Sequence, residues 1–257
     1  MNASQIWTAY YTIVVREVLR FSRIWLQTII PPVITTALYF VIFGNLIGSQ
    51  IGNMDGHTYM EFIVPGLIMM SVITNAYANV VSSFYGSKFQ GNIAEMLVSP
   101  TPNWIILLGY VTGGVARGIA VGAAVTLVSL FFSHLHIEHL WVTGTIIVLT
   151  SALFSLAGLI NAVYAKSFDD ITIVPTFVLT PLTYLGGVFY SISLLPPFWQ
   201  SASLTNPILY MVNGFRYGIL GTADISIWVS YSVIIGFIVL LGGFAMYLLH
   251  RGIGIRS

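Results

Sequence analysis

The lysines and cysteines that nucleotide binding and covalent catalysis would need are scarce or absent in this sequence. The two lysines are Lys88, which follows Ser87, and Lys166, which follows Ala165. The lysine of a phosphate-binding loop follows a glycine, so we do not expect this chain to bind ATP through such a loop. No GxSxG, HExxH or DFG signature is present, and there is no cysteine. We therefore expect that the chain is not an enzyme and needs no cofactor.

The acidic residues also argue against ion-coupled chemistry inside a membrane. A proton- or sodium-coupled carrier normally places an acid near the membrane midplane. All eight acids lie at the ends of apolar runs or between them, so any energy is expected to come from another subunit. A channel or secondary carrier that works without a motor is the alternative. The acids are Glu17, Asp55, Glu61, Glu95, Glu138, Asp169, Asp170 and Asp224.

One short segment between two apolar runs has the residue types of a metal site. It contains His134, His136, Glu138 and His139. Imidazole and carboxylate groups suit zinc or copper, but a site also needs fixed geometry and supporting hydrogen bonds. A short external loop offers little of either, so we predict no metal site.

The composition indicates a membrane protein. Hydrophobic residues make up 57% of the 257 residues, charged residues 7%, and the mean hydropathy is +0.90. Soluble domains carry about 25% charged residues, so this chain cannot cover a globular surface in water. The net charge of +1 gives no reason to expect nucleic acid as a partner.

Apolar runs of membrane length predict an all-α membrane protein with six transmembrane helices in one domain, residues 1–257. The first run is too long for the hydrophobic region of a signal peptide, so we expect it to stay as a span. A polar stretch, residues 83–102, separates the second and third spans and reads as a short helix. The expected spans are 24–48, 59–82, 104–132, 140–164, 171–189 and 227–250.

The segment before the first span, residues 1–23, has the pattern of a helix lying in the membrane interface. Arg16, Arg20 and Arg23 recur at helical spacing, opposite an apolar set. The alternative is a basic flank that only orients the first span.

The distribution of basic residues predicts the orientation. Six spans place both termini on the same side, and the side richer in lysine and arginine is cytoplasmic. The opposite side would hold only Arg216, so both termini are expected in the cytoplasm. The bases of the cytoplasmic side are then Arg16, Arg20, Arg23, Lys88, Lys166, Arg251 and Arg256.

Residues 190–225, between the fifth and sixth spans, are half apolar and rich in aromatics. Neither half is long enough to cross, and such segments are often interfacial or re-entrant. We expect two short helices that dip into the membrane from outside and are broken at Asn206-Pro207. An ordinary external loop is the alternative.

Two groups of polar residues fall within the expected spans. Ser71, Asn75 and Asn79 are four apart and share one helix face, where they either line a polar path or join helices by hydrogen bonds. Arg117 lies in a stripe of small residues that favours close helix packing. Its partner is an acid, a carbonyl or a lipid phosphate, unless the span begins later and Arg117 is a cytoplasmic anchor. The stripe consists of Gly114, Gly118 and Gly122.

Three segments resemble the membrane subunits of type-2 ABC exporters. "YMEFIVPGLIMM" (59–70) is similar to that family's second span, and "GNIAEMLVSPTP" (91–102) to its cytoplasmic segment. "PLTYLGGVFYSISLLPPFWQSASLTNPILYMVNGFRYG" (181–218) resembles its region between the fifth and sixth spans. The match covers most of the chain, and Gln90-Gly91 departs from it where a basic residue is expected.

The resemblance implies a permease in the bacterial inner membrane. Two copies of the chain would pair, contact membrane lipid and dock two copies of an ABC ATPase subunit. The polar helix would be the coupling helix, and residues 190–218 an external gate. The cargo would be a drug, polysaccharide, glycolipid or lipid. The implied coupling residues are Lys88, Asn92, Glu95, Met96 and Leu97. The implied gate residues are Pro196, Pro197, Trp199, Asn206 and Pro207. The candidate pathway or dimer-interface residues are Ser71, Asn75, Asn79 and Arg117.

Overall fold

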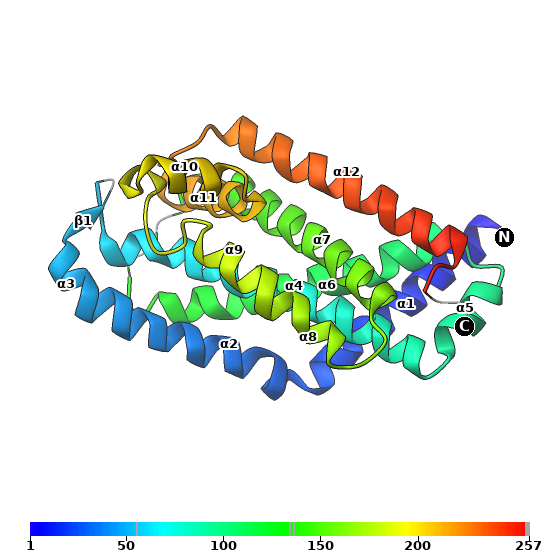
Figure 1. Ribbon diagram of the computed structural model, residues 1–257. Helices are drawn as coiled ribbons and strands as arrows, with labels where there is room; N and C mark the ends of the chain where they lie inside the picture. Colours follow the sequence, from blue (N-terminus) through cyan, green and yellow to red (C-terminus); the bar gives the residue numbers. More distant parts are fainter. Residues whose placement is uncertain (55, 134, 136, 255–257) are drawn as a thin grey trace.

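Long helices running side by side form the protein, as the apolar runs predict (Figure 1). The computed structural model describes residues 1–54, 56–133, 135 and 137–254. The first part of the chain comprises α1 (Ala3–Arg23), α2 (Trp25–Tyr39), a π-helical stretch (Phe40–Ile47), α3 (Gly48–Ile51), the antiparallel pair β1 (Asn53–Met54) and β2 (His57–Thr58), α4 (Tyr59–Phe89) and α5 (Asn92–Val98). The second part comprises α6 (Asn103–Ser129), α7 (Leu140–Tyr164), α8 (Asp170–Val174), a π-helical turn (Pro175–Leu179), α9 (Thr180–Tyr184), a 3₁₀ turn (Ile192–Leu194), α10 (Pro197–Leu204), α11 (Pro207–Leu220) and α12 (Ile227–Arg251).

Five helices within the described residues are long and apolar enough to cross a membrane. They match five of the six expected spans. These helices are Trp25–Gly44, Tyr59–Phe89, Asn103–Ser129, Leu140–Tyr164 and Ile227–Arg251.

The segment expected as the fifth span is shorter. α8, the π-helical turn and α9 have five residues each, so together they rise about 22 Å, less than the roughly 30 Å hydrocarbon core. Pro175 and Pro181 interrupt the hydrogen-bond ladder, and the hydroxyl of Thr180 donates to the Pro175 carbonyl at 2.9 Å. The sixth crossing therefore stays a prediction.

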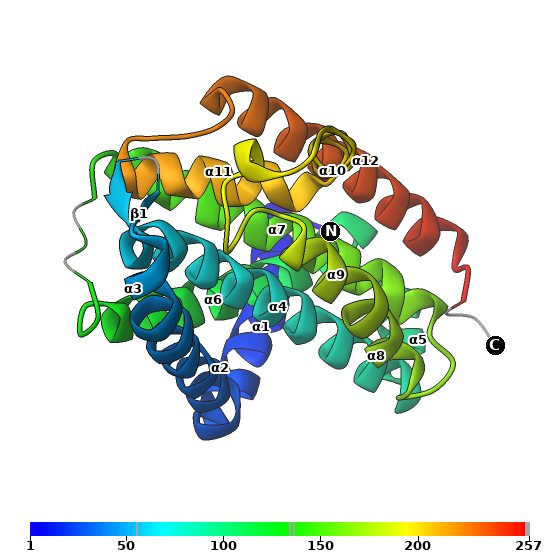
Figure 2. The ribbon, with the colours of Figure 1, turned by 60° about the vertical axis from the view of Figure 1, so that its left-hand side comes forward.

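α4 forms the centre of the bundle and is buried along most of its length. A capping box fixes its first turn, because the Thr58 N–H donates to the Glu61 carboxylate at 2.9 Å and the Glu61 N–H donates to the Thr58 hydroxyl at 3.4 Å. In two views of the ribbon, α2 and α12 lie on opposite sides of α4 (Figures 1 and 2).

Glycines allow α4, α6 and α7 to approach closely. A Cβ at Gly158 of α7 would lie 2.6 Å from the carbonyl oxygen of Tyr77 in α4. A Cβ at Gly118 of α6 would lie 2.5 Å from Ser151 Oγ in α7. The small-residue stripe of α6 thus faces a neighbouring helix, as its spacing predicts.

The two ends of the bundle differ. Both termini and α5 lie at one end, whereas α3, β1 and α10 lie at the other (Figure 1). Segment 190–225 contains α10 and α11, and α11 is largely buried, packed against α4, α7 and α12. The chain breaks between these helices at Thr205-Asn206. Re-entry of the two helices into the bilayer stays a prediction.

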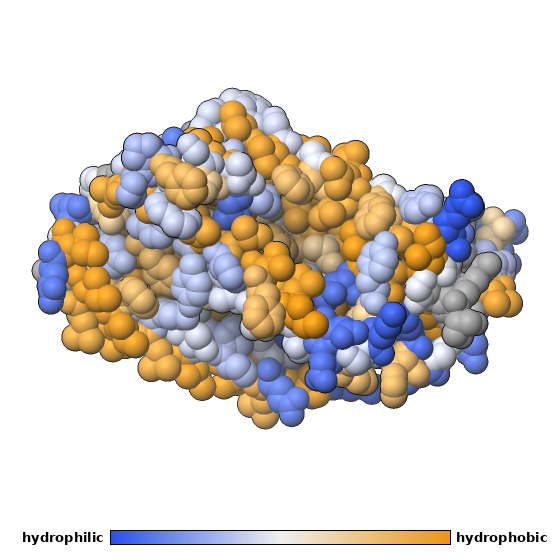
Figure 3. All heavy atoms as spheres, viewed as in Figure 1, coloured by the Kyte–Doolittle hydropathy of each residue, from blue (hydrophilic) through white to orange (hydrophobic). Residues whose placement is uncertain are grey.

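Apolar side chains cover the outer flanks of the bundle. Leu26 and Leu38 of α2, and Val239 and Leu240 of α12, are each more than half exposed. Figure 3 shows apolar residues along the α2 flank and strongly polar residues toward the end that carries the termini. This distribution suits helices whose surroundings are lipid chains.

We expect Gly158→Ala to destabilise the bundle, because its methyl group would meet the backbone of α4, which cannot rotate away. Overpacking of this kind costs about 1–3 kcal/mol. Gly144→Ala in the same helix is the matched control, since a Cβ there meets nothing within 4 Å. Thermal unfolding in detergent compares the two variants, and equal midpoints would contradict the close approach of α7 to α4.

Candidate functional site

One face of α4 carries a polar residue every four positions, and we call this row the polar ladder. Its members are Ser71, Asn75, Asn79, Ser83 and Ser87. The first three were expected from their spacing, which Ser83 continues. Ser87 was missed, although it continues the same spacing. All five side chains form a hydrogen bond with a side chain of a neighbouring helix.

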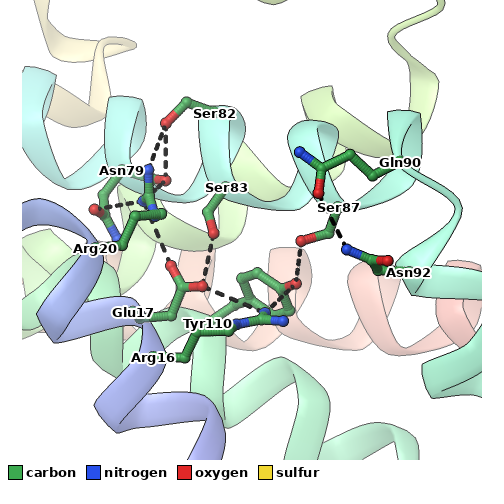
Figure 4. Close-up of polar contacts among 10 residues, drawn as sticks. All are labelled: Arg16, Glu17, Arg20, Asn79, Ser82, Ser83, Ser87, Gln90, Asn92 and Tyr110. Atoms are coloured by element: carbon green, nitrogen blue, oxygen red, sulfur yellow. Dashed lines mark hydrogen bonds and ion pairs between the residues drawn. The ribbon is translucent and has the colours of Figure 1, made fainter.

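Helix α1 supplies the partners of the middle of the ladder. Arg20 Nη2 donates to Asn79 Oδ1 and to the Asn79 carbonyl oxygen, both at 2.8 Å. Ser83 Oγ donates to Glu17 Oε1 at 2.6 Å. Figure 4 shows Glu17 and Arg20 of α1 pointing toward Asn79 and Ser83 of α4. The basic face of α1 is therefore turned partly into the bundle.

Glu17 is the residue whose importance the sequence did not indicate. Its side chain is fully buried, and its two oxygens lie 3.4 Å from Arg16 Nη2 and Arg20 Nη2 respectively. A buried carboxylate is tolerated only when charges and hydrogen bonds satisfy it. The signal available in the sequence was a single acid within an arginine-rich helix. Elsewhere on α1, Trp7 and Tyr11 are exposed, as expected of an interfacial helix.

Tyr110 of α6 completes the network at the Ser87 end of the polar ladder. Its hydroxyl accepts a hydrogen bond from Arg16 Nη2 at 2.7 Å and donates to Ser87 Oγ at 3.2 Å (Figure 4). Beside this network lies a hollow of about 590 Å³, reaching from Arg23 to Asn92 at the start of α5. Helices α1, α4 and α6 are thus joined next to the polar helix.

Arg117 lies near the middle of α6 and contacts the polar ladder near its Ser71 end. Its Nη2 donates to Asn75 Oδ1 at 3.0 Å, while Asn75 Nδ2 donates to the Ser71 carbonyl at 3.0 Å. The hydroxyls of Ser71 and Thr36 of α2 lie 3.2 Å apart. α6 begins at Asn103, so Arg117 lies well within the helix, and its position inside the bilayer or at the cytoplasmic edge stays a prediction.

A cavity of about 320 Å³ opens between α2, α4 and α6. Ser71, Asn75 and Arg117 contribute to its wall, whereas Asn79 belongs to the network with α1. The residues of the ladder thus make interhelical hydrogen bonds, one of the two roles expected of them. Their role in lining a translocation pathway or dimer interface stays a prediction.

The polar helix between α4 and α6 is α5, which starts after Gly91 in a left-handed conformation with φ +81°. Asn92 and Glu95 are exposed. Ile93 is buried and Met96 partly buried against the core. The backbone of residue 97 belongs to α5, and the Leu97 side chain lies outside the part of the chain that the structure describes.

Lys88, expected among the coupling residues, has partners within the chain. Its Nζ donates to the carbonyl oxygens of Val163 and Ala165, both at 2.7 Å, at the carboxyl end of α7. A cation at this end of a helix is favourable because the last carbonyls carry partial negative charge. Lys88 therefore ties the end of α4 to α7.

The expected gate residues lie at the starts of α10 and α11. Asn206 caps α11, since its Oδ1 accepts from the Ile208 N–H at 3.0 Å, and its Nδ2 donates to the Leu182 carbonyl at 2.6 Å. Trp199 of α10 is 47% exposed. Their role as a gate stays a prediction. The remaining members of the set are Pro196, Pro197 and Pro207, which precede or begin the two helices.

No metal site is evident in the described part of the chain, where no three His, Asp or Glu residues are grouped to hold an ion. His134 and His136 of the histidine-rich segment lie outside the described residues. His139 stacks on the ring of Tyr217, with centroids 4.9 Å apart.

Replacing Glu17 by glutamine is expected to lower stability by about 1–3 kcal/mol, because Arg16, Arg20 and Ser83 would lose the carboxylate that they contact. Glu95→Gln, the same change at an exposed acid, is the control. Thermal unfolding in detergent measures both variants. If Glu17→Gln unfolds at the wild-type temperature, the carboxylate does not hold α1 against α4.

Comparison with known proteins gives this arrangement a family. Residues 8–220 match the family model described as ABC-2 type transporter. The chain is 61% identical over 252 residues to an Escherichia coli K12 protein named inner membrane transport permease YadH, with 98% of each chain covered. It is 22% identical over 225 residues to nodulation protein J of Rhizobium leguminosarum bv. viciae, with 87% of each covered. This chain therefore belongs to the ABC-2 type transporter family.

Proposed function

We propose that this chain is the membrane-spanning permease of an ATP-driven exporter, and that a separate ATPase subunit supplies the energy. The family supports a transport role, and the name of the E. coli relative supports a place in the inner membrane. The observation that carries the proposal is α5, a short helix with exposed polar residues at the end of the bundle that holds both termini (Figure 1).

The surface around α5 has the character of a docking site for another protein. Val98 is 88% exposed and Phe89 is 69% exposed. Glu95 lies exposed between them in the sequence. Apolar side chains rimmed by polar ones mark protein interaction sites. We assign this surface to the ATPase, with Asn92 and Glu95 as its polar contacts.

Helix α5 is coupled firmly enough to the bundle to act as a lever. Ile93 packs into the core beneath α4, and Lys88 fixes the end of α4 on α7. A displacement of α5 would therefore move α4, and through Glu17 and Tyr110 it would move α1 and α6. An ATPase that holds α5 differently in its two states would shift the permease between two arrangements.

The complete transporter would contain two copies of this chain and two ATPase subunits, with the cargo path between the permeases. The exposed apolar flanks of α2 and α12 suit contact with lipid or a second copy. Residues 171–189, which comprise most of α8, the π-helical turn, α9 and the non-helical residues after them, would make the sixth crossing, which puts both termini and α5 in the cytoplasm.

Glu95→Arg should reduce cargo-stimulated ATP hydrolysis by the reconstituted permease–ATPase pair about tenfold or more, because a reversed charge at an interface costs several kcal/mol. Glu138→Arg, the same change at an exposed acid near the other end, is the control. Membrane insertion should be normal in both variants. Unchanged stimulation in Glu95→Arg would count against docking at α5, and cargo movement by the isolated chain would favour a motor-independent channel.

The orientation can be tested by single-cysteine labelling, since the chain has no native cysteine. In spheroplasts, a membrane-impermeant maleimide should label Ser201→Cys in α10 and leave Val98→Cys unlabelled. In inverted vesicles the pattern should reverse. Labelling of Val98→Cys from the periplasmic face would show that the proposed orientation is wrong.

A further inference from the structure

The guanidinium of Arg117 has more hydrogen-bonding capacity than its surroundings use. Arginine has five N–H donors and no acceptor. Among the described residues, the hydrogen bond that Arg117 makes runs from Nη2 to Asn75 Oδ1. Its Nε is buried without a partner there. The side chain is therefore held in place by a neutral amide that leaves most of its donors available.

The charge of Arg117 is also uncompensated within the described chain, where no carboxylate forms an ion pair with it. The carboxylate of Glu17, on the same side of α4, already lies between Arg16 and Arg20. Arg20 adds a second positive charge to this side through its bond to Asn79. A charge in the middle of a membrane span needs a partner or water.

Arg117 lines the cavity between α2, α4 and α6, which has room for such a partner. The volume of about 320 Å³ lies at the lower end of the range of small-ligand sites, roughly 300–1,000 Å³. Asn75, Thr35 and Gln27 add polar groups to the wall, while Pro31 and Met70 add apolar ones. One fixed cation with neutral polar groups beside apolar surface is complementary to an anionic amphiphile.

We propose that this cavity binds the anionic headgroup, phosphate or carboxylate, of a lipid-like molecule, with Arg117 as its charge partner and Asn75 as the positioning residue. The guanidinium fork matches the oxygens of either group. The bound molecule is a bilayer lipid or the cargo itself. In the second case the inference rests on the proposed function and narrows the cargo to acidic amphiphiles.

The binding test uses the full-length permease alone, so its result does not depend on coupling to the ATPase. Native mass spectrometry would compare retained phosphatidylglycerol with phosphatidylcholine of the same acyl chains. Wild type should prefer phosphatidylglycerol, and Arg117→Gln should reduce this preference about tenfold, as loss of a charged hydrogen-bond partner predicts. Arg251→Gln, at the exposed end of α12, is the matched control and should behave as wild type.

Thr35→Phe provides a second test that leaves the charge in place. The ring would fill the cavity from α2, so phosphatidylglycerol retention should fall as in Arg117→Gln. If Arg117→Gln does not fold, the single variants Thr35→Phe and Arg117→Lys replace it in the binding measurement. Equal retention by wild type and Thr35→Phe, or equal retention of the two lipids by wild type, would overturn the proposal. Displacement of the lipid by millimolar inorganic phosphate would show a site for free anions and would also overturn it.

A final comparison separates the two sources of the headgroup. The permease is reconstituted with its ATPase in phosphatidylcholine vesicles, with and without phosphatidylglycerol. If phosphatidylglycerol stimulates ATP hydrolysis and Arg117→Gln abolishes this stimulation, the bound anionic amphiphile behaves as cargo. Retained binding without stimulation supports the same site and identifies a bilayer lipid. Glu95→Arg should lose stimulated ATP hydrolysis but still bind phosphatidylglycerol, because docking of the ATPase and the anion site are tested separately.

Discussion

The burial of the Glu17 carboxylate is the constraint from which the rest of this structure can be understood. A charge removed from water must be matched by opposite charge and hydrogen bonds, and Arg16, Arg20 and Ser83 supply them. These contacts fix the rotation of α1 about its own axis. They also determine which face of α4 points toward α1, and hence where the remaining polar groups of α4 lie.

The same requirement extends along the ladder. Each polar side chain of α4 would be costly against lipid, and hydrogen bonds to α1, α2 and α6 remove that cost. The result is two groups of polar contacts along one face of α4, one from Tyr110 near α5 to Asn79 and the other from Asn75 to Thr36 beside the cavity. The first group lies next to the surface proposed for the ATPase. The residues that hold α1 and α6 against α4 are thus also those through which the proposed coupling would act.

Much of the architecture follows from local rules. Apolar runs of sufficient length indicated five of the spans, because a helix satisfies its own backbone wherever lipid surrounds it. The α6 stripe indicated close packing, because glycine leaves room for a neighbouring backbone. The segment expected as the fifth span stays a prediction, because its helices are short and a π-helical turn between Pro175 and Pro181 separates them. Hydropathy measures how apolar a segment is and does not report how the prolines shape it.

What the sequence determined by itself is the class of molecule: a helical membrane protein with a polar helix between two long spans. The tertiary structure decided which polar groups meet. Spacing placed Asn75 and Asn79 on one helix face, but only the packing of α1 and α6 gave them Arg117 and Arg20 as partners. It likewise turned Lys88 toward α7 and buried Glu17. Such pairings join residues distant in the chain, and helical periodicity describes one helix at a time, so no local pattern contains them.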